Sequence, residues 1–121
     1  MEFKRGDGIT HYFSVPTDSY SATDTLHFMA KPAFDDDTTD ASAVIEGTFT
    51  SADAEEVGEN MRYTCYFPPS ATNDIDTNGA AEVRYLGEFE LIDSSNVPTT
   101  FPGGKKKIDV RLYADIRRGN V

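Results

Sequence analysis

Apolar and polar residues alternate with a period of two along most of this chain, the pattern of β-strands that bury one face. In residues 9–15 the odd positions face inward, and Pro16 ends the segment because proline cannot donate to a strand ladder. In residues 25–31 the even positions face inward and Pro32 follows. The inward residues predicted for these two strands are Ile9, His11, Phe13, Val15, Leu26, Phe28 and Ala30.

Four further strands are predicted, at residues 43–49, 62–67, 81–91 and 106–117. In the first of them the register stays open, with either Ile45 and Phe49 or Val44 toward the core. The third carries Gly87 on its apolar face, which predicts a bulge or a close approach by another backbone. The other inward residues are Tyr63, Cys65, Phe67, Ala81, Val83, Tyr85, Phe89, Leu91, Ile108, Val110, Leu112, Ala114 and Ile116.

The segments between these strands have the composition of loops. Residues 34–41 are rich in Asp and Thr, and residues 94–104 hold two prolines and two glycines, typical of the loop of a long hairpin. Residues 51–60 are predicted as a loop with at most a short helix, capped by Ser51 or Asp53. About six or seven amphipathic strands in 121 residues predict one all-β domain over residues 1–121. The expected architecture is an antiparallel β-sandwich of immunoglobulin-like form.

Charge separates the chain into two unequal parts. The net charge is -10, which disfavours nucleic acid and anionic membranes as partners. Residues 1–104 carry 19 acids and 5 bases, whereas residues 105–121 carry 6 bases and 2 acids. The basic segment predicts an interface with the acidic face of another subunit, either a different protein or a second copy in a homo-oligomer; a solvated basic edge is the plainer alternative. Its residues are Lys105, Lys106, Lys107, Arg111, Arg117 and Arg118.

Catalytic chemistry has little support in the sequence. The two histidines, His11 and His27, fall in different strands and lack a Ser, Cys or Asp at a spacing typical of a catalytic arrangement. Cys65 lies on an apolar face, where burial would keep the thiol protonated. One cysteine excludes an internal disulfide and suits synthesis in a reducing cytoplasm. We therefore expect no enzyme activity and no cofactor.

Two weaker patterns suggest a ligand site. Four acidic side chains in one loop supply the oxygen ligands that calcium prefers, although the Gly and Glu of an EF-hand loop are missing and a solvated loop is the alternative. Three tyrosines fall on the polar faces of their strands, where they serve either as stacking surfaces for a sugar or as scattered surface residues. The metal candidates are Asp35, Asp36, Asp37 and Asp40, and the ligand-binding candidates are Tyr12, Tyr66 and Tyr113.

The order of short motifs resembles a family of phage domains. Residues 4–7 read Lys-Arg-Gly-Asp, residues 29–32 read Met-Ala-Lys-Pro, and residues 79–85 read Gly-Ala-Ala-Glu-Val-Arg-Tyr. Gly-Glu-Phe-Glu-Leu follows at residues 87–91, before a Pro- and Gly-containing loop and an apolar closing strand. This order resembles the small immunoglobulin-like amino-terminal domains of bacteriophage upper baseplate and tail-fibre proteins. Val83 departs from the pair of tyrosines that the family carries in the late strand.

The resemblance implies a virion structural module, made in the host cytoplasm, that packs against other subunits of a tail or baseplate and transfers no catalytic residue. The alternative that the residues themselves leave open is a β-sandwich that binds a surface glycan or another ligand, with help from calcium. Both hypotheses place the activity of the chain on its surface.

Overall fold

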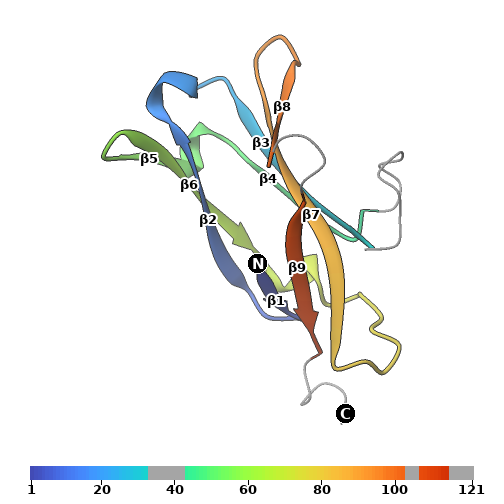
Figure 1. Ribbon diagram of the computed structural model, residues 1–121. Helices are drawn as coiled ribbons and strands as arrows, with labels where there is room; N and C mark the ends of the chain where they lie inside the picture. Colours follow the sequence, from blue (N-terminus) through green and yellow to red (C-terminus); the bar gives the residue numbers. More distant parts are fainter. Residues whose placement is uncertain (33–42, 103–106, 115–121) are drawn as a thin grey trace.

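The computed structural model describes residues 1–32, 43–102 and 107–114. Within them, nine strands form two sheets that face each other (Figure 1). The strands are β1 (Glu2–Lys4), β2 (Ile9–Pro16), β3 (Thr25–Pro32), β4 (Ile45–Phe49), β5 (Ala54–Val57), β6 (Asn60–Phe67), β7 (Glu82–Ile92), β8 (Pro98–Phe101) and β9 (Ile108–Tyr113). Three short 3-10 helices, η1 (Thr17–Ser19), η3 (Ser51–Asp53) and η4 (Pro69–Ala71), lie in the connections.

The larger sheet has the order β1-β9-β7-β3-β4, and the smaller sheet has the order β2-β6-β5. All pairs are antiparallel except β1 with β9, so the larger sheet is mixed rather than wholly antiparallel as the sequence predicted. β8 and β9 occupy the same edge of β7, one beside its second half and the other beside its first half. The long β7 strand therefore pairs with three other strands of the larger sheet, β3, β8 and β9.

The strand order is that of an immunoglobulin-like sandwich. β2, β6 and β5 take the places of strands B, E and D, while β9, β7, β3 and β4 take those of G, F, C and C′. In constant-type domains the first strand lies beside strand B. Here β1 instead pairs with β9 in the opposite sheet, which leaves β2 at an edge. The sequence analysis therefore predicted the sandwich class, although with fewer strands than the nine described.

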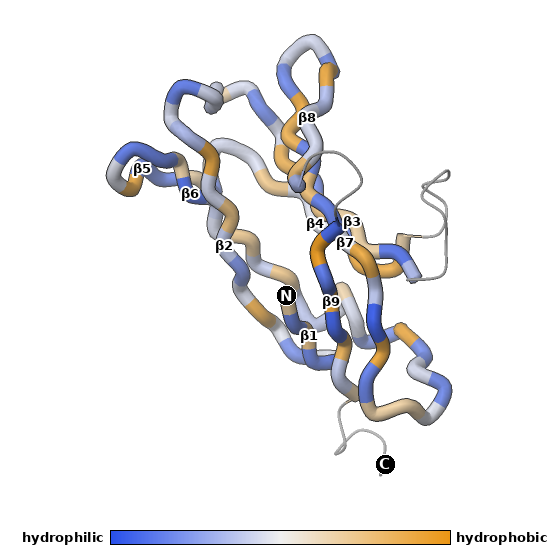
Figure 2. The backbone as a smooth tube through the Cα atoms, viewed as in Figure 1, coloured by the Kyte–Doolittle hydropathy of each residue, from blue (hydrophilic) through white to orange (hydrophobic). Residues whose placement is uncertain are grey.

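Aromatic rings fill the space between the two sheets. The ring of Phe67 meets those of Phe3 and Phe49 edge to face at centroid distances of 5.0 and 5.5 Å. Across the layers, Phe13 of β2 stacks on Phe89 of β7 at 4.4 Å. The alternation of hydropathy that produces this packing is visible along β7 and β9 (Figure 2). The fully buried apolar residues include Phe3, Val15, Leu26, Phe28, Ala30, Ile45, Tyr63, Cys65, Phe67, Val110 and Leu112.

Most of the predicted inward residues face the core, but Ala81 is exposed and precedes β7, β9 ends at Tyr113, and Ile116 lies outside the described residues. Ile45 and Phe49 are buried, which resolves the open register of β4 in their favour. Gly87 forms no bulge, because β7 pairs one to one with β3 and β9 through this position. The close approach there comes from side chains: a Cβ at Gly87 would lie 2.8 Å from Cγ2 of Val110 and 3.1 Å from the ring of Phe28.

Three strands went unrecognised in the sequence: β1, β5 and β8. β5 and η3 occupy the segment predicted as a loop with at most a short helix, so the short helix is confirmed and the strand was missed. The cap of η3 is Thr50 rather than Ser51 or Asp53, and Asp53 completes the capping box by accepting from the Thr50 amide at 3.0 Å. β8 lies within the predicted loop at residues 94–104 and forms a hairpin with β7.

Candidate binding surface

β2 is an edge strand without charged side chains. Its eight residues read Ile-Thr-His-Tyr-Phe-Ser-Val-Pro and pair with β6 along their whole length. No other described strand pairs with β2. Natural proteins commonly protect sheet edges with charges, with short strands or with prolines, because an open edge offers unpaired backbone groups to another chain. β2 carries only the proline at its upper end, so the rest of this edge is open to pairing.

The direction of the free backbone groups follows from the pairing with β6. The amide of Thr17 donates to the carbonyl of Glu59 at 3.0 Å, one position beyond the pair Pro16–Asn60. Because hydrogen-bonded and non-hydrogen-bonded pairs alternate in an antiparallel ladder, the odd residues of β2 bond to β6. The even residues therefore direct their amides and carbonyls to the open edge. Thr10, Tyr12 and Ser14 supply both groups there.

The outer face of the smaller sheet carries an aromatic and basic cluster next to this edge. Tyr12 is 58% exposed, and the guanidinium of Arg62 lies 4.7 Å from the centre of its ring. Arg62 also donates to Oε1 of Glu55 at 2.6 Å, which fixes the guanidinium between the two neighbours. Arg62 was not among the predicted site residues. Its position two residues from Thr64 and four from Tyr66 in an alternating strand was the signal for it.

Tyr66 extends the same cluster along β6. It is 55% exposed and belongs to the pair Thr10–Tyr66, diagonal to Tyr12 on the same face. Gly8 makes room for its ring, because a Cβ at that position would lie 2.7 Å from the hydroxyl oxygen and 3.3 Å from two ring carbons. The structure thus brings Tyr12 and Tyr66, two of the three predicted ligand tyrosines, to one surface. We call Tyr12, Arg62 and Tyr66 the aromatic cluster.

Tyr113 lies apart from the aromatic cluster. It ends β9 in the larger sheet, where it pairs with Lys4 on one side and Glu82 on the other. Together with Phe3, Lys4 and Ile9 it lines a shallow cleft of about 370 Å³ beside β1. A ligand that spans all three predicted tyrosines is therefore not supported by their placement, since Tyr113 belongs to the opposite layer.

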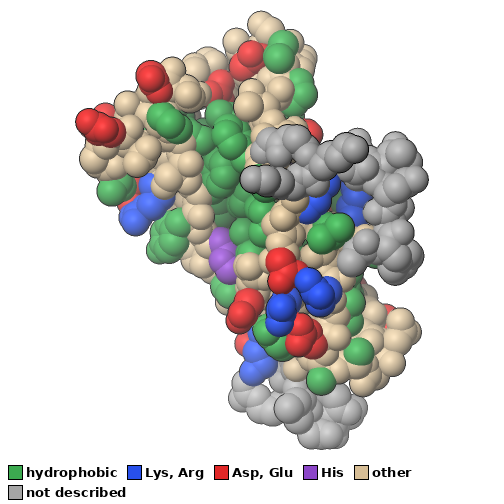
Figure 3. Space-filling model, in the orientation of Figure 1, with side chains coloured by type: hydrophobic (Ala, Val, Ile, Leu, Met, Phe, Trp, Pro, Cys, Tyr) green, Lys and Arg blue, Asp and Glu red, His purple; other side chains and the backbone are tan. Residues whose placement is uncertain are grey.

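Apolar side chains also reach the surface where β2 faces the larger sheet. In Figure 3 they gather between β2 on one side and β8 and β9 on the other. Phe13 contributes here, and its ring meets that of the partly buried Phe101 at 5.3 Å. His11 lies lower on the same face of β2, with its ring 5.0 Å from that of Phe3. The side of the sandwich next to β2 is consequently apolar between its two layers.

His11 links β2 to the first strand. Its Nε2–H donates to the carbonyl of Glu2 at 2.8 Å, which places the proton of the neutral ring on Nε2. Burial lowers the pKa of His11, and this effect outweighs the hydrogen bond to Glu2. The neutral ring of His11 therefore joins β2 to β1 through this hydrogen bond. His27 lies on the outer face of the larger sheet opposite Glu90, so the two histidines do not converge.

Two of the six basic residues predicted at an interface, Lys107 and Arg111, form ion pairs within the larger sheet. Nζ of Lys107 lies 2.8 Å from Oε2 of Glu88, and the guanidinium of Arg111 contacts Glu82 and Asp109 at 3.3 and 3.2 Å. These contacts hold the two basic residues against their own sheet. The remaining predicted interface residues, Lys105, Lys106, Arg117 and Arg118, lie outside the described residues, as do the predicted calcium ligands Asp35, Asp36, Asp37 and Asp40.

One end of the sandwich is strongly acidic. Three segments, residues 17–24, 50–60 (which include β5) and 93–97, meet at the end where β2 finishes, and none of them contains a lysine or arginine. Their carboxylates belong to Asp18, Asp24, Asp53, Glu55, Glu56, Glu59 and Asp93. Among the described residues no group of His, Cys, Asp and Glu has the arrangement of a metal site. The acidic end is therefore a feature of the surface charge.

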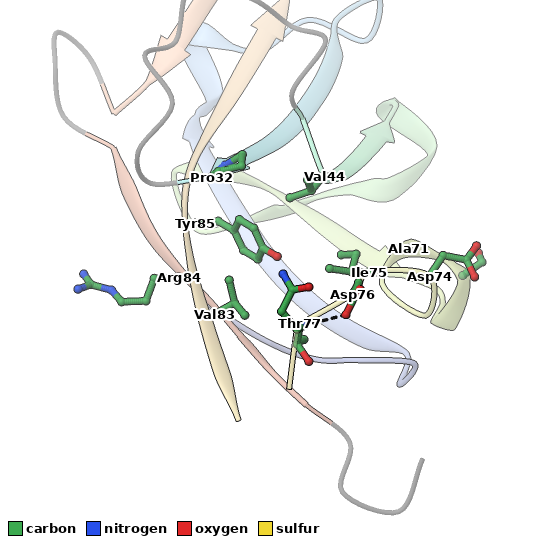
Figure 4. A pocket seen from close by; sticks show the side chains of 12 residues that line it. Pro32, Val44, Ala71, Asp74, Ile75, Asp76, Thr77, Val83, Arg84 and Tyr85 are labelled. Atoms are coloured by element: carbon green, nitrogen blue, oxygen red, sulfur yellow. Dashed lines mark hydrogen bonds between the residues drawn. The ribbon is translucent and has the colours of Figure 1, made fainter. Parts of the chain in front are cut away.

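A cleft with a volume of about 580 Å³ lies at the opposite end. Figure 4 shows the ring of Tyr85 directed into it beside Val83, whereas the side chain of Arg84 points away. Burial raises the pKa of Tyr85, so its hydroxyl stays protonated. Oδ1 of Asp76 already accepts from the amide of Asn78 at 2.8 Å. The titratable residues that line this cleft are Asp74, Asp76, Arg84 and Tyr85.

Cys65 offers no reactive thiol. It is fully buried, its Sγ is 3.8 Å from the carbonyl of Tyr63, and burial raises its pKa to about 12. A thiol with such a pKa is protonated at neutral pH and is a poor nucleophile. The described chemistry of this chain is thus concentrated on backbone groups and aromatic side chains at the β2 edge.

Comparison of the chain with protein-family models, with characterised proteins and with solved structures gives no significant match. Within the described segments, no helix is long and apolar enough to cross a membrane.

Proposed function

We propose that this chain is a non-catalytic structural module that assembles with other protein subunits through the open edge of β2 and the adjoining aromatic cluster. The observation that carries the proposal is the edge itself: eight residues long, free of charged side chains, and paired on one side only in the described structure. Main-chain hydrogen bonds supply the affinity when an extended segment adds to such an edge.

The aromatic cluster supports the same proposal. Tyrosine and arginine are enriched among the residues that contribute most to protein–protein binding, because they bury large areas and retain polar contacts. Tyr12 stands on the edge strand itself, so an added strand would lie against it, while Arg62 and Tyr66 lie one strand further in on the same face. The motif order of the sequence suggests a phage or prophage virion as the setting, with tail, baseplate or head fibre as the assembly.

The test is coexpression of the chain with a differently tagged second copy of itself and with the proteins encoded beside it in its source genome. We expect a stoichiometric complex that is lost when Ser14→Pro removes an outward amide from β2, a position where proline is compatible with an edge strand. The matched control is Thr48→Pro on β4, another edge strand of the described structure. A complex that survives Ser14→Pro but not Thr48→Pro would place assembly on the other sheet and refute the proposal.

A second function is favoured by one observation. Tyr66 lies against Gly8 with more than half of its side chain exposed, an arrangement suited to stacking on a sugar ring. The corresponding proposal is a glycan- or ligand-binding module, assisted by calcium. A glycan array followed by calorimetry would test it. Binding lost in Tyr66→Ala would support this function, while a calcium-induced rise in melting temperature without glycan binding would indicate a structural ion only.

A further inference from the structure

We propose that the occupant of the β2 edge is β2 of a second copy of this chain, paired antiparallel with Tyr12 of each copy on the two-fold axis. This inference rests on the proposed function, which it deepens by naming the partner. The smaller sheets of the two copies then form one continuous sheet with the order β5-β6-β2-β2-β6-β5.

Backbone geometry favours this register. The amides and carbonyls of Thr10, Tyr12 and Ser14 point toward the open edge, as the alternation with β6 requires. With Tyr12 on the axis, Thr10 of one copy lies opposite Ser14 of the other. The three pairs make about six hydrogen bonds in a regular antiparallel ladder. Pro16, which has no amide hydrogen, falls outside this central ladder.

Side chains match in the same register. On the outer face Tyr12 meets the Tyr12 of the other copy, with a threonine and a serine on either side. On the inner face His11 lies opposite Phe13, and Ile9 opposite Val15, so apolar and aromatic groups of the second copy cover the surface where Phe13 is partly exposed. Aromatic and β-branched cross-strand pairs of this kind each stabilise a ladder.

Charge also selects this edge for self-association. Each copy has a net charge of -10, so two copies repel each other. β2 is a surface on which neither copy contributes a charged side chain. Antiparallel pairing separates the two acidic ends by about 27 Å, the length of eight residues of strand. That separation exceeds the screening length of about 10 Å at 0.1 M salt. Parallel pairing would instead bring the acidic ends together.

The other described edges fit a second copy less well. β4 has Glu46 in its length, β5 has Glu55 and Glu56, and β1 has only three residues with a charge at each end. β8 has four residues and begins with Pro98. Pairing β4 with β4 of a second copy, or β5 with β5, would place like charges close to each other, which destabilises a ladder.

The experiment is a charge swap at the axis, read by light scattering after gel filtration over a range of protein concentrations. We expect the wild-type chain to show a concentration-dependent dimer. Tyr12→Lys and Tyr12→Glu should each be monomeric, because two like charges meet on the axis, and an equimolar mixture should restore a 1:1 dimer. Thr64→Lys is the matched control, since Thr64 lies opposite Tyr12 on β6 but away from the edge; it should remain dimeric.

Melting temperatures of all variants show whether each one folds. A folded wild type that stays monomeric at every concentration would refute self-pairing, as would a dimer that persists in both Tyr12 variants or a mixture that fails to restore it. Retention of the coexpressed complex, with its loss in Ser14→Pro, would in that case assign the edge to a different protein and leave the proposed function intact. Absence of both the dimer and the coexpressed complex would refute both proposals.

Discussion

Gly87 of β7 faces side chains from its neighbours β3 and β9, and replacing it with alanine tests the packing described for the core. The added Cβ would lie 2.8 Å from Cγ2 of Val110 and 3.1 Å from two ring carbons of Phe28. Carbon atoms attract optimally at about 3.5–4.0 Å, so neighbours on both sides must move. Overpacking of this size lowers stability by roughly 1–3 kcal/mol.

The sign of the effect separates packing from backbone entropy. Glycine within a strand is about 0.5–1 kcal/mol less favourable than alanine when space allows. Without the close contacts, Gly87→Ala would therefore stabilise the protein. With them, we expect a net loss of about 1–2 kcal/mol in the free energy of unfolding, measured by urea denaturation with an unchanged slope.

A double-mutant cycle identifies the contact that produces the loss. Val110→Ala alone should lower the free energy of unfolding by roughly 1–3 kcal/mol, because it leaves a cavity beside Gly87. In the double variant the new methyl group occupies part of that cavity, so its loss should fall below the sum of the single losses by about 1 kcal/mol. A stabilised Gly87→Ala, or losses that simply add, would refute the packing argument.

Three other predictions concern separate parts of the fold. Because burial lowers the pKa of His11, the unfolded state binds more protons than the folded state below pH 6.5. The free energy of unfolding of the wild type relative to His11→Gln should therefore be fully present above pH 6.5 and decline as the pH falls through the folded pKa, which urea denaturation at each pH would measure. Cys65 should react with Ellman's reagent at pH 8 only as fast as the protein unfolds, whereas fast labelling of the folded chain would contradict its burial. Thr50→Ala should lower the free energy of unfolding by about 1 kcal/mol through loss of the capping box, and Thr50→Ser should recover most of it in the same denaturation assay.

Much of the sandwich could be predicted because the alternation of apolar and polar residues along a strand shows which of its faces is buried. The inward faces of β2, β3, β6 and β7 follow from the sequence, since each has several apolar residues in register. β1 and β5 gave no such signal. β1 has one apolar residue between two charged ones, and β5 reads Ala-Glu-Glu-Val, so both owe their conformation to pairing with β9 and β6. Tertiary partners of this kind are invisible to a local pattern.

The candidate surface was predictable only in part for the same reason. Alternation placed Tyr12 and Tyr66 on polar faces, but their proximity depends on the register between β2 and β6. The role of Gly8 beneath Tyr66 requires the folded backbone as well. Sequence charge likewise suggested an available basic interface, whereas Lys107 and Arg111 form ion pairs within the larger sheet. Net charge along a chain does not reveal which charges are already engaged.

The parallel pairing of β1 with β9 ties the third residue of the chain to the one hundred and twelfth. During synthesis the hairpins β5–β6 and β7–β8 can close as soon as they leave the ribosome, because their partners are adjacent in sequence. β1 must instead wait for β9, because Phe3 pairs with Leu112. β1 therefore lacks its partner strand until almost the whole domain has been made, a period in which chaperone binding or premature association is favoured.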